Sequence, residues 1–168
     1  ERERLQLYHT GYSADIVQSK VERNLRLLQM DAVGKEDISY QYDYLVDCYF
    51  GVKDYAKAKH YAELSLTADI PYLGNRSHIY HMWIESMRQL HDPLEQQYEA
   101  ACQAIREYPQ LPEFYGEAGM ILCGMGKLRA ARQMLHQALS RYAGQVQQDV
   151  PLAATYFTAE IAGRIRQR

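Results

Sequence analysis

A helical hairpin pattern occurs at least twice in this chain, and it limits the fold more than any other feature. The clearest copy covers residues 111–142, and a second covers residues 38–66. In each copy an aromatic residue precedes a small or apolar pair, a short turn follows, and a second helix carries small residues seven positions apart. Small residues at this spacing let antiparallel helices pack closely, so the pattern predicts stacked hairpins that share a core.

The two copies share a pattern of aromatic, apolar and small residues. The later copy carries Tyr115, Ala118, Gly119, Gly126, Leu128, Ala131, Leu135 and Ala138, and the earlier copy carries Tyr42, Leu45, Val46, Tyr49, Tyr55, Ala58, Ala62 and Ser65. A middle unit over residues 75–109 is weaker, because its turn lacks a glycine, Gln97 stands where a small residue is expected, and its two helices differ in register by about one residue. We therefore expect three hairpins, with the middle one distorted and a first period nearer to about 40 residues than to about 34.

These repeats closely resemble the tetratricopeptide family. Ala131 and Ala138 stand at the small-residue positions of that family, and Ala58 and Ser65 stand at the same positions in the earlier copy. The resemblance implies an all-α fold, a right-handed superhelix of three helical hairpins with flanking N-terminal and C-terminal capping helices. It also implies that the first helix of each hairpin lines a concave surface.

Local signals place the elements along the chain. Asp37 and Asp54 are expected to cap the two helices of the first hairpin, and Asp92 followed by Pro93 is expected to begin the second helix of the middle one. The expected organisation is the end of an upstream domain over residues 1–12, a linker helix over 13–34, three hairpins over 35–143 and a capping helix over 144–168.

Composition excludes several classes of protein. The 19 basic and 21 acidic residues give no electrostatic argument for binding nucleic acid. No apolar run approaches the roughly 20 residues that span a membrane. Three scattered cysteines indicate free thiols in a reducing compartment, so we expect a cytoplasmic protein. Because the chain begins with ERERLQ rather than with Met, we also expect it to be a piece of a longer protein.

A candidate binding face follows from the positions on the first helices that point away from the packed stripe. These positions hold Tyr40, Asp43, Asp47 and Phe50, then His78, His81, Glu85 and Arg88, and in the third hairpin Glu113, Gly116, Met120 and Cys123. The mixture is polar and slightly acidic with some aromatic area, which suits a peptide or a neighbouring domain. A face that binds nothing specific remains the alternative.

Metal chemistry has one candidate set. His78, His81 and Glu85 share one face of a helix, and their spacing can ligate zinc. The preferred interpretation is that they line the solvated inner face, because the sequence fixes no further donor beside them. No metal or cofactor is therefore expected in this chain itself, and a zinc-dependent helical enzyme is kept only as a third interpretation.

The first thirty residues carry a second resemblance. His9, Gly11 and Tyr12 form a turn, and residues 22–28 read ERNLRLL. This segment resembles the end of the catalytic domain in a bacterial group of family 2 glycosyltransferases, in which tetratricopeptide repeats come next. The resemblance implies a parent enzyme that uses a divalent metal, manganese or magnesium, with His9 as a possible neighbour of that metal. The nucleotide-sugar domain and its D-x-D motif are absent from this sequence.

The sequence thus predicts a protein-interaction region that is not catalytic by itself and that belongs to a cytoplasmic bacterial glycosyltransferase. The expected partner is a protein, a peptide or the upstream catalytic domain, and self-association as a homodimer is allowed. Neither nucleic acid nor a membrane span is expected. The alternative is a freestanding tetratricopeptide adaptor that is unrelated to sugar transfer.

Overall fold

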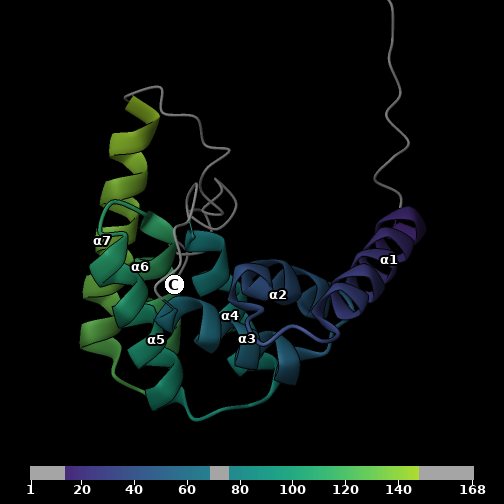
Figure 1. Ribbon diagram of the computed structural model, residues 1–168. Helices are drawn as coiled ribbons and strands as arrows, with labels where there is room; N and C mark the ends of the chain where they lie inside the picture. Colours follow the sequence, from purple (N-terminus) through teal and green to yellow (C-terminus); the bar gives the residue numbers. More distant parts are fainter. Residues whose placement is uncertain (1–13, 69–75, 148–168) are drawn as a thin grey trace, which may run out of the picture. The chain divides into compact units, whose positions relative to one another are not determined.

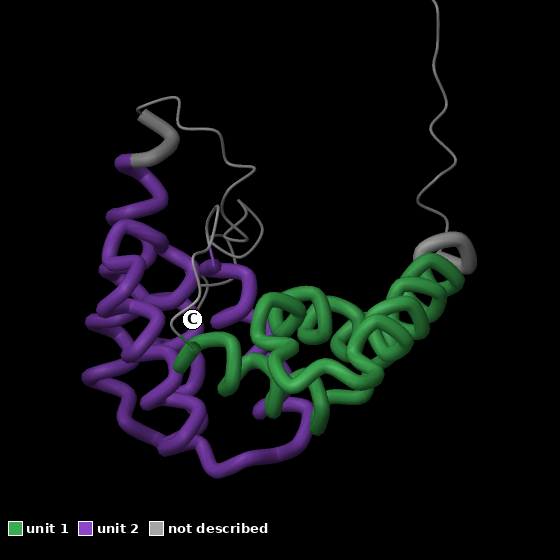
Figure 2. Tube along the Cα trace, viewed as in Figure 1, with its two compact units in different colours: residues 1–71 green, residues 72–168 purple. Residues whose placement is uncertain are grey.

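The computed structural model describes residues 14–68 and 76–147, and this part of the chain is helical throughout (Figure 1). Its elements are α1 (Ala14–Ala32), the 3-10 helix η2 (Ser39–Gln41), α2 (Tyr42–Gly51), α3 (Tyr55–Thr67), α4 (Ser77–Gln89), α5 (Leu94–Glu107), α6 (Pro112–Gly124) and α7 (Leu128–Gln147). The expected all-α fold is confirmed. The chain divides into two compact units, Glu1–Pro71 and Tyr72–Arg168 (Figure 2).

In the first unit α2 packs against both α1 and α3. The shared core centres on Leu45, Tyr49 and Ala58, and Leu25 and Leu28 cover it from α1. The rings of Tyr49 and Tyr61 stack with centroids 5.5 Å apart. The helix predicted to precede the repeats is therefore present, and its apolar stripe faces the first hairpin.

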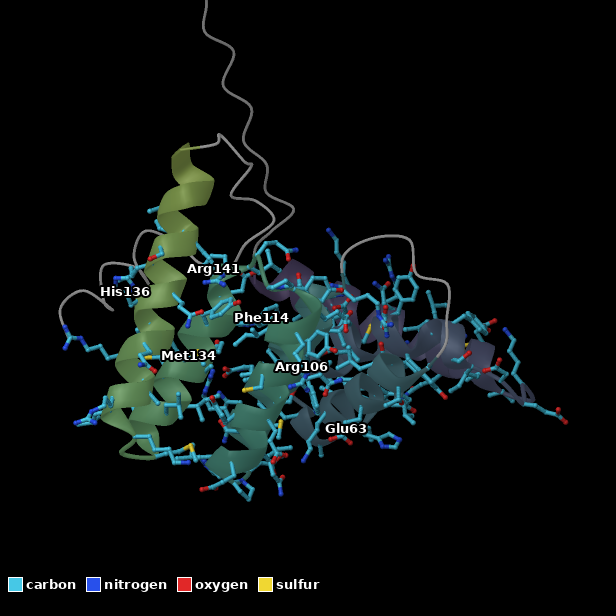
Figure 3. The ribbon with its side chains drawn as sticks, turned by 90° about the vertical axis from the view of Figure 1, so that its left-hand side faces the viewer. Glu63, Arg106, Phe114, Met134, His136 and Arg141 are labelled. Carbon is cyan, nitrogen blue, oxygen red and sulfur yellow. The ribbon has the colours of Figure 1, made fainter. Side chains whose placement is uncertain are left out.

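In the second unit each helix from α4 to α7 packs against the next along the chain. An aromatic cluster joins the middle hairpin to the third, since the ring of Tyr80 on α4 lies 6.1 Å from the rings of both Tyr108 and Phe114. Farther along, Arg141 of α7 lies over the ring of Tyr115 at 3.7 Å and donates from Nε to the carbonyl oxygen of Pro109 at 2.8 Å. Figure 3 shows Arg141 directed toward α6, with His136 on the opposite side of α7.

One backbone turn recurs in all three hairpins. The first helices end before a residue with positive φ, which is Lys53 at 62°, His91 at 57° and Gly126 at 72°. In each turn the amide of the next residue donates to a carbonyl five positions back, as Lys127 does to Leu122 at 3.0 Å. This left-handed C-terminal turn favours glycine, yet the first two hairpins form it without one. The turns are 38 and 35 positions apart, so the longer first period is confirmed.

The distortion of the middle hairpin is one additional residue in its turn. Three residues separate α2 from α3 and α6 from α7, whereas four separate α4 from α5. Gln97 therefore occupies the position that Ala58 and Ala131 hold in the other hairpins, and it is 3% exposed. Its Nε2 donates to the carbonyl oxygen of Asp92 at 2.7 Å, so a large polar side chain replaces an alanine by bonding the longer turn.

Small residues bring the paired helices into close contact, as predicted. Ala131 and Ala138 of α7 are 1% and 0% exposed. A Cβ atom built on Gly119 of α6 would lie 2.6 Å from Cδ2 of Leu135, which is closer than carbon atoms approach. A side chain at position 119 would therefore require Leu135 to shift.

One of the three predicted helix caps forms. Only the cap at Asp54 forms as predicted, where Oδ1 accepts from the amide of Lys57 at 3.2 Å. The N-cap of η2 is Ile38 rather than Asp37, although Oδ1 of Asp37 accepts from the amide of Ser39 at 2.8 Å. The prediction at Asp92 is wrong, because Pro93 is the N-cap of α5 and helix geometry begins at Leu94.

The boundary expected at residue 144 is also wrong for the helix, since α7 continues through Gly144 to Gln147. Nothing lies within 4 Å of a Cβ atom built on Gly144, so neither a turn nor a close contact requires glycine there. The capping helix predicted after Asp149, residues 1–12 and His9 lie outside the described residues.

Candidate protein-binding face

The twelve predicted face residues fall at the same four positions before each turn. Counted back from Lys53, His91 and Gly126, Tyr40 matches His78 and Glu113, and Phe50 matches Arg88 and Cys123. The shared register places each set along one side of a first helix. We call the set on α2 the α2 stripe, and the sets on α4 and α6 together the α4–α6 face.

The α2 stripe consists of Tyr40, Asp43, Asp47 and Phe50. Tyr40 is 50% exposed, and its hydroxyl donates to Oδ2 of Asp31 at 2.8 Å and accepts from Nζ of Lys35 at 2.7 Å. Asp47 is exposed as predicted. The hydrogen bonds of Asp31 with Lys35 and Tyr40 hold the pKa of the Asp31 carboxyl below its usual value.

Two residues of this stripe were predicted to face outward but contact other residues of the first unit. Asp43 is half-buried and accepts a hydrogen bond from Oγ of Ser65 on α3. Phe50 packs against the core cluster, and its ring meets that of Tyr55 edge-on with centroids 5.6 Å apart. Phe50 therefore supports the hairpin, which makes it a poor position for testing binding alone.

Charged side chains from α4 and α6 meet on the α4–α6 face. Arg88 of α4 lies between two carboxylates, donating from Nη1 to Glu85 and from Nη2 to Glu117 of α6. Nδ1 of His81 lies 4.0 Å from Oε1 of Glu117. Burial acts to lower the pKa of Arg88, but the negative charges of Glu117 and Glu85 outweigh it, so this pKa stands above its usual value. His78 is half-buried on the same side of α4 as His81.

Glu117 is a residue of this face that the sequence analysis missed. It lies one position beyond Gly116, so helical periodicity alone assigns it to a neighbouring stripe. The signal that could have identified it is its charge, which is opposite to that of Arg88 on the preceding first helix. Only the packing of α4 beside α6 shows that the two side chains meet.

The third hairpin differs from the predicted face at two positions. Met120 is 40% exposed and Cys123 is half-buried, but Glu113 is only 5% exposed and Gly116 is buried. Within residues 14–68 and 76–147, no other residue donates a hydrogen bond to either carboxylate oxygen of Glu113. Burial raises the pKa of the Glu113 carboxyl to about 7, against the smaller opposing effect of its own backbone amide. Glu113 is thus a buried acid rather than an exposed one.

The zinc interpretation gains no support from the geometry. Glu85 is engaged by Arg88, and its Oε1 accepts from Nε2 of Gln89 at 2.7 Å. Over residues 14–68 and 76–147, no three His, Cys, Asp or Glu side chains are grouped so that they could hold a metal ion. No helix in the same ranges is long and apolar enough to cross a membrane.

The sequence of this chain matches no protein-family model and no curated protein. Solved structures do match. YrrB, described as a TPR protein with an unusual peptide-binding site, aligns with a TM-score of 0.62 at 18% identity over 80% of this chain and 68% of its own. The chain has a tetratricopeptide-like fold.

Two further structures share this tetratricopeptide-like fold. MamA aligns with a TM-score of 0.64 at 13% identity, over 96% of this chain and 91% of its own. PcrH, crystallised in complex with the chaperone binding region of PopB, aligns with a TM-score of 0.58 at 15% identity, over 79% of this chain and 95% of its own. At these identities the likeness concerns the fold.

Proposed function

We propose that this chain is a tetratricopeptide-like scaffold that binds a segment of a partner protein on its first helices. The observation that carries the proposal is the α4–α6 face, where Arg88, His81, Glu85 and Glu117 from two successive first helices form a half-buried charged surface. Fixed charges with partly buried neighbours bind peptides selectively, because a wrong partner leaves those charges unpaired. PcrH and YrrB support the proposal, since the first was crystallised with a protein segment and the second is described by its peptide-binding site.

The test begins with a displayed library of random peptides selected against the whole chain. Binders are then titrated against the wild type and two variants by calorimetry. Arg88→Ala removes the central cation of the face and should weaken binding by about 1–2 kcal/mol, as loss of an arginine anchor does. The matched control is Arg132→Ala, which removes an exposed arginine from the second helix of the third hairpin and should leave affinity unchanged.

Stability has to be measured beside affinity for both variants, because Arg88 also separates two carboxylates in the free protein. Equal affinity in the wild type and Arg88→Ala would remove the α4–α6 face from the proposal. Failure to select any binder would argue against a peptide-binding role altogether.

A second proposal concerns the parent protein and rests on the sequence motif of His9, Gly11 and Tyr12 that precedes ERNLRLL. If the chain is the repeat region of a family 2 glycosyltransferase, the upstream gene sequence should encode a nucleotide-sugar domain with a D-x-D motif. YrrB is described as a TPR protein with a peptide-binding site and PcrH was crystallised with a chaperone binding region, so the freestanding adaptor has the better support. A cytoplasmic location belongs to both interpretations.

The glycosyltransferase proposal makes a prediction about this chain. It should bind neither a nucleotide sugar nor manganese in calorimetry, because the carboxylates that hold such a metal would lie upstream. In the full-length enzyme His9→Ala should lower turnover much more than it lowers the melting temperature. Full turnover in that variant would show that His9 has no role near the metal.

A further inference from the structure

Glu113 is chemically the least satisfied residue of the α4–α6 face. It is 5% exposed, and in the part of the chain that the structure describes no other residue donates a hydrogen bond to its buried carboxylate oxygens. An ionised carboxylate in such a place is unfavourable unless a cation or a set of donors reaches it. The position lies in the first turn of α6, where helix geometry alone would accept an uncharged residue. The side chain therefore requires an explanation other than packing.

Arg88, the arginine of this face, already pairs with two other carboxylates. Glu113 lies four positions before Glu117, so the two carboxylates project from the same side of α6. Glu117 pairs with Arg88, and Arg88 also pairs with Glu85. The face thus carries three glutamates and one arginine, an excess of two negative charges when all three carboxylates are ionised.

We propose that the α4–α6 face receives a lysine or arginine side chain from its partner, and that the carboxylate of Glu113 accepts this cation. This inference rests on the proposed function and specifies the chemistry of the partner. The fit comes from charge complementarity, because a basic residue supplies the counter-ion that the face lacks.

Apolar area lies along the same stripe. Met120 is 40% exposed and stands seven positions after Glu113, two turns farther along α6. Gly116 lies between them and contributes no side chain. The aliphatic stem of a lysine or arginine packs well on such a surface while its charged end reaches an acid. The preferred ligand is therefore a basic residue next to an apolar one.

The test uses peptides selected from a random library against the whole chain. We expect them to be enriched in lysine or arginine at one fixed position. Replacing that residue by norleucine, which keeps the chain length and removes the charge, should weaken binding to the wild type by about tenfold or more, as loss of a charge-assisted hydrogen bond does. The same replacement should change binding to Glu113→Gln by less than about twofold, because the variant no longer holds the charge that the lysine meets.

Glu99→Gln is the matched control, since it makes the same change on an exposed position of α5. It should retain the full tenfold discrimination. Equal loss of affinity in the wild type and Glu113→Gln would overturn the assignment of the cation to Glu113. Binders without a basic residue that still depend on Arg88 would overturn this inference and leave the proposed function standing, whereas a library that yields no binder would overturn both.

Discussion

Gly119 of α6 lies against Leu135 of α7, so a substitution there tests how closely the two helices pack. The Cβ atom of an alanine there would meet both Cδ2 and Cγ of Leu135, at 2.6 and 2.7 Å. We expect Gly119→Ala to lower the free energy of unfolding by about 1–3 kcal/mol, despite the better helix propensity of alanine. Urea denaturation measures this change.

Gly144→Ala is the control for that experiment. Position 144 lies inside α7 with open space around the would-be Cβ, so alanine should raise stability there by about 0.5–1 kcal/mol. If both variants were equally stable, the close crossing at Gly119 would be wrong.

Glu113 makes stability depend on pH in a predictable direction. Burial raises its pKa from 4.5 to about 7, so the folded protein holds this proton more tightly than the unfolded chain does. Its destabilising effect is therefore absent below about pH 4.5, grows as pH rises and is complete above about pH 7. Glu113→Gln should stabilise the protein by up to about 3 kcal/mol at pH 8 and by little at pH 4.

Denaturation curves for both proteins at pH 4, 6 and 8 would check this, with Glu99→Gln as the exposed control. A stability difference between wild type and Glu113→Gln that stays constant over this range would show that Glu113 ionises normally in the folded protein.

Glu113 also shows what helical periodicity can and cannot predict. Helical spacing correctly placed Glu113 in register with Tyr40 and His78. Nothing in the sequence indicated that neighbouring segments would bury its side chain. Direction on a helix follows from position, whereas burial depends on what neighbouring segments contribute. The pair between Arg88 and Glu117 escaped prediction for the same reason.

The middle hairpin shows at the scale of an element how a repeat absorbs an additional residue. Gln97 fills the position of an alanine and bonds the carbonyl of Asp92 in the longer turn. Gln97→Ala should remove that bond and leave a small cavity, lowering the free energy of unfolding by about 1–2 kcal/mol. Gln96→Ala, at the exposed neighbouring position, should change stability by less than about 0.5 kcal/mol. Urea denaturation measures the free energy of unfolding of both variants. Equal losses in the two would show that the hydrogen bond from Gln97 to the turn does not stabilise the hairpin.

Element boundaries were predictable where local chemistry decides them. Asp54 caps α3 as expected, because an aspartate before a helix accepts an amide hydrogen bond without any tertiary contact. The prediction one residue too early at Asp92 failed because the additional residue of the turn moves the start of α5 to Leu94. The hairpins were expected to end at residue 143, yet α7 continues to Gln147, since an isolated glycine such as Gly144 weakens a helix only slightly.

At the scale of the whole molecule, the fold class could be predicted because the same pattern of small and aromatic residues recurs in the first and third hairpins. Many residues of the repeated pattern, including Ala58, Tyr115 and Ala138, are buried in the core, whereas Tyr42 and Tyr55 are half-buried and Gly126 is exposed. The superhelical course of the array depends on how the two units join, and it remains a prediction. Partner chemistry depends on a few side chains of the first helices, which periodicity locates without revealing their pairing.

The central claim is that the α4–α6 face binds a protein segment, and amide hydrogen exchange with a selected peptide tests it most directly. Bound peptide should slow exchange in α4 and α6, at amides around His81 and Glu117, and it should leave the exposed side of α5 unchanged. Glu113→Gln should reduce this protection at equal peptide concentration, whereas Glu99→Gln should not. Protection confined to α5 and α7, with none in α4 or α6, would contradict the account.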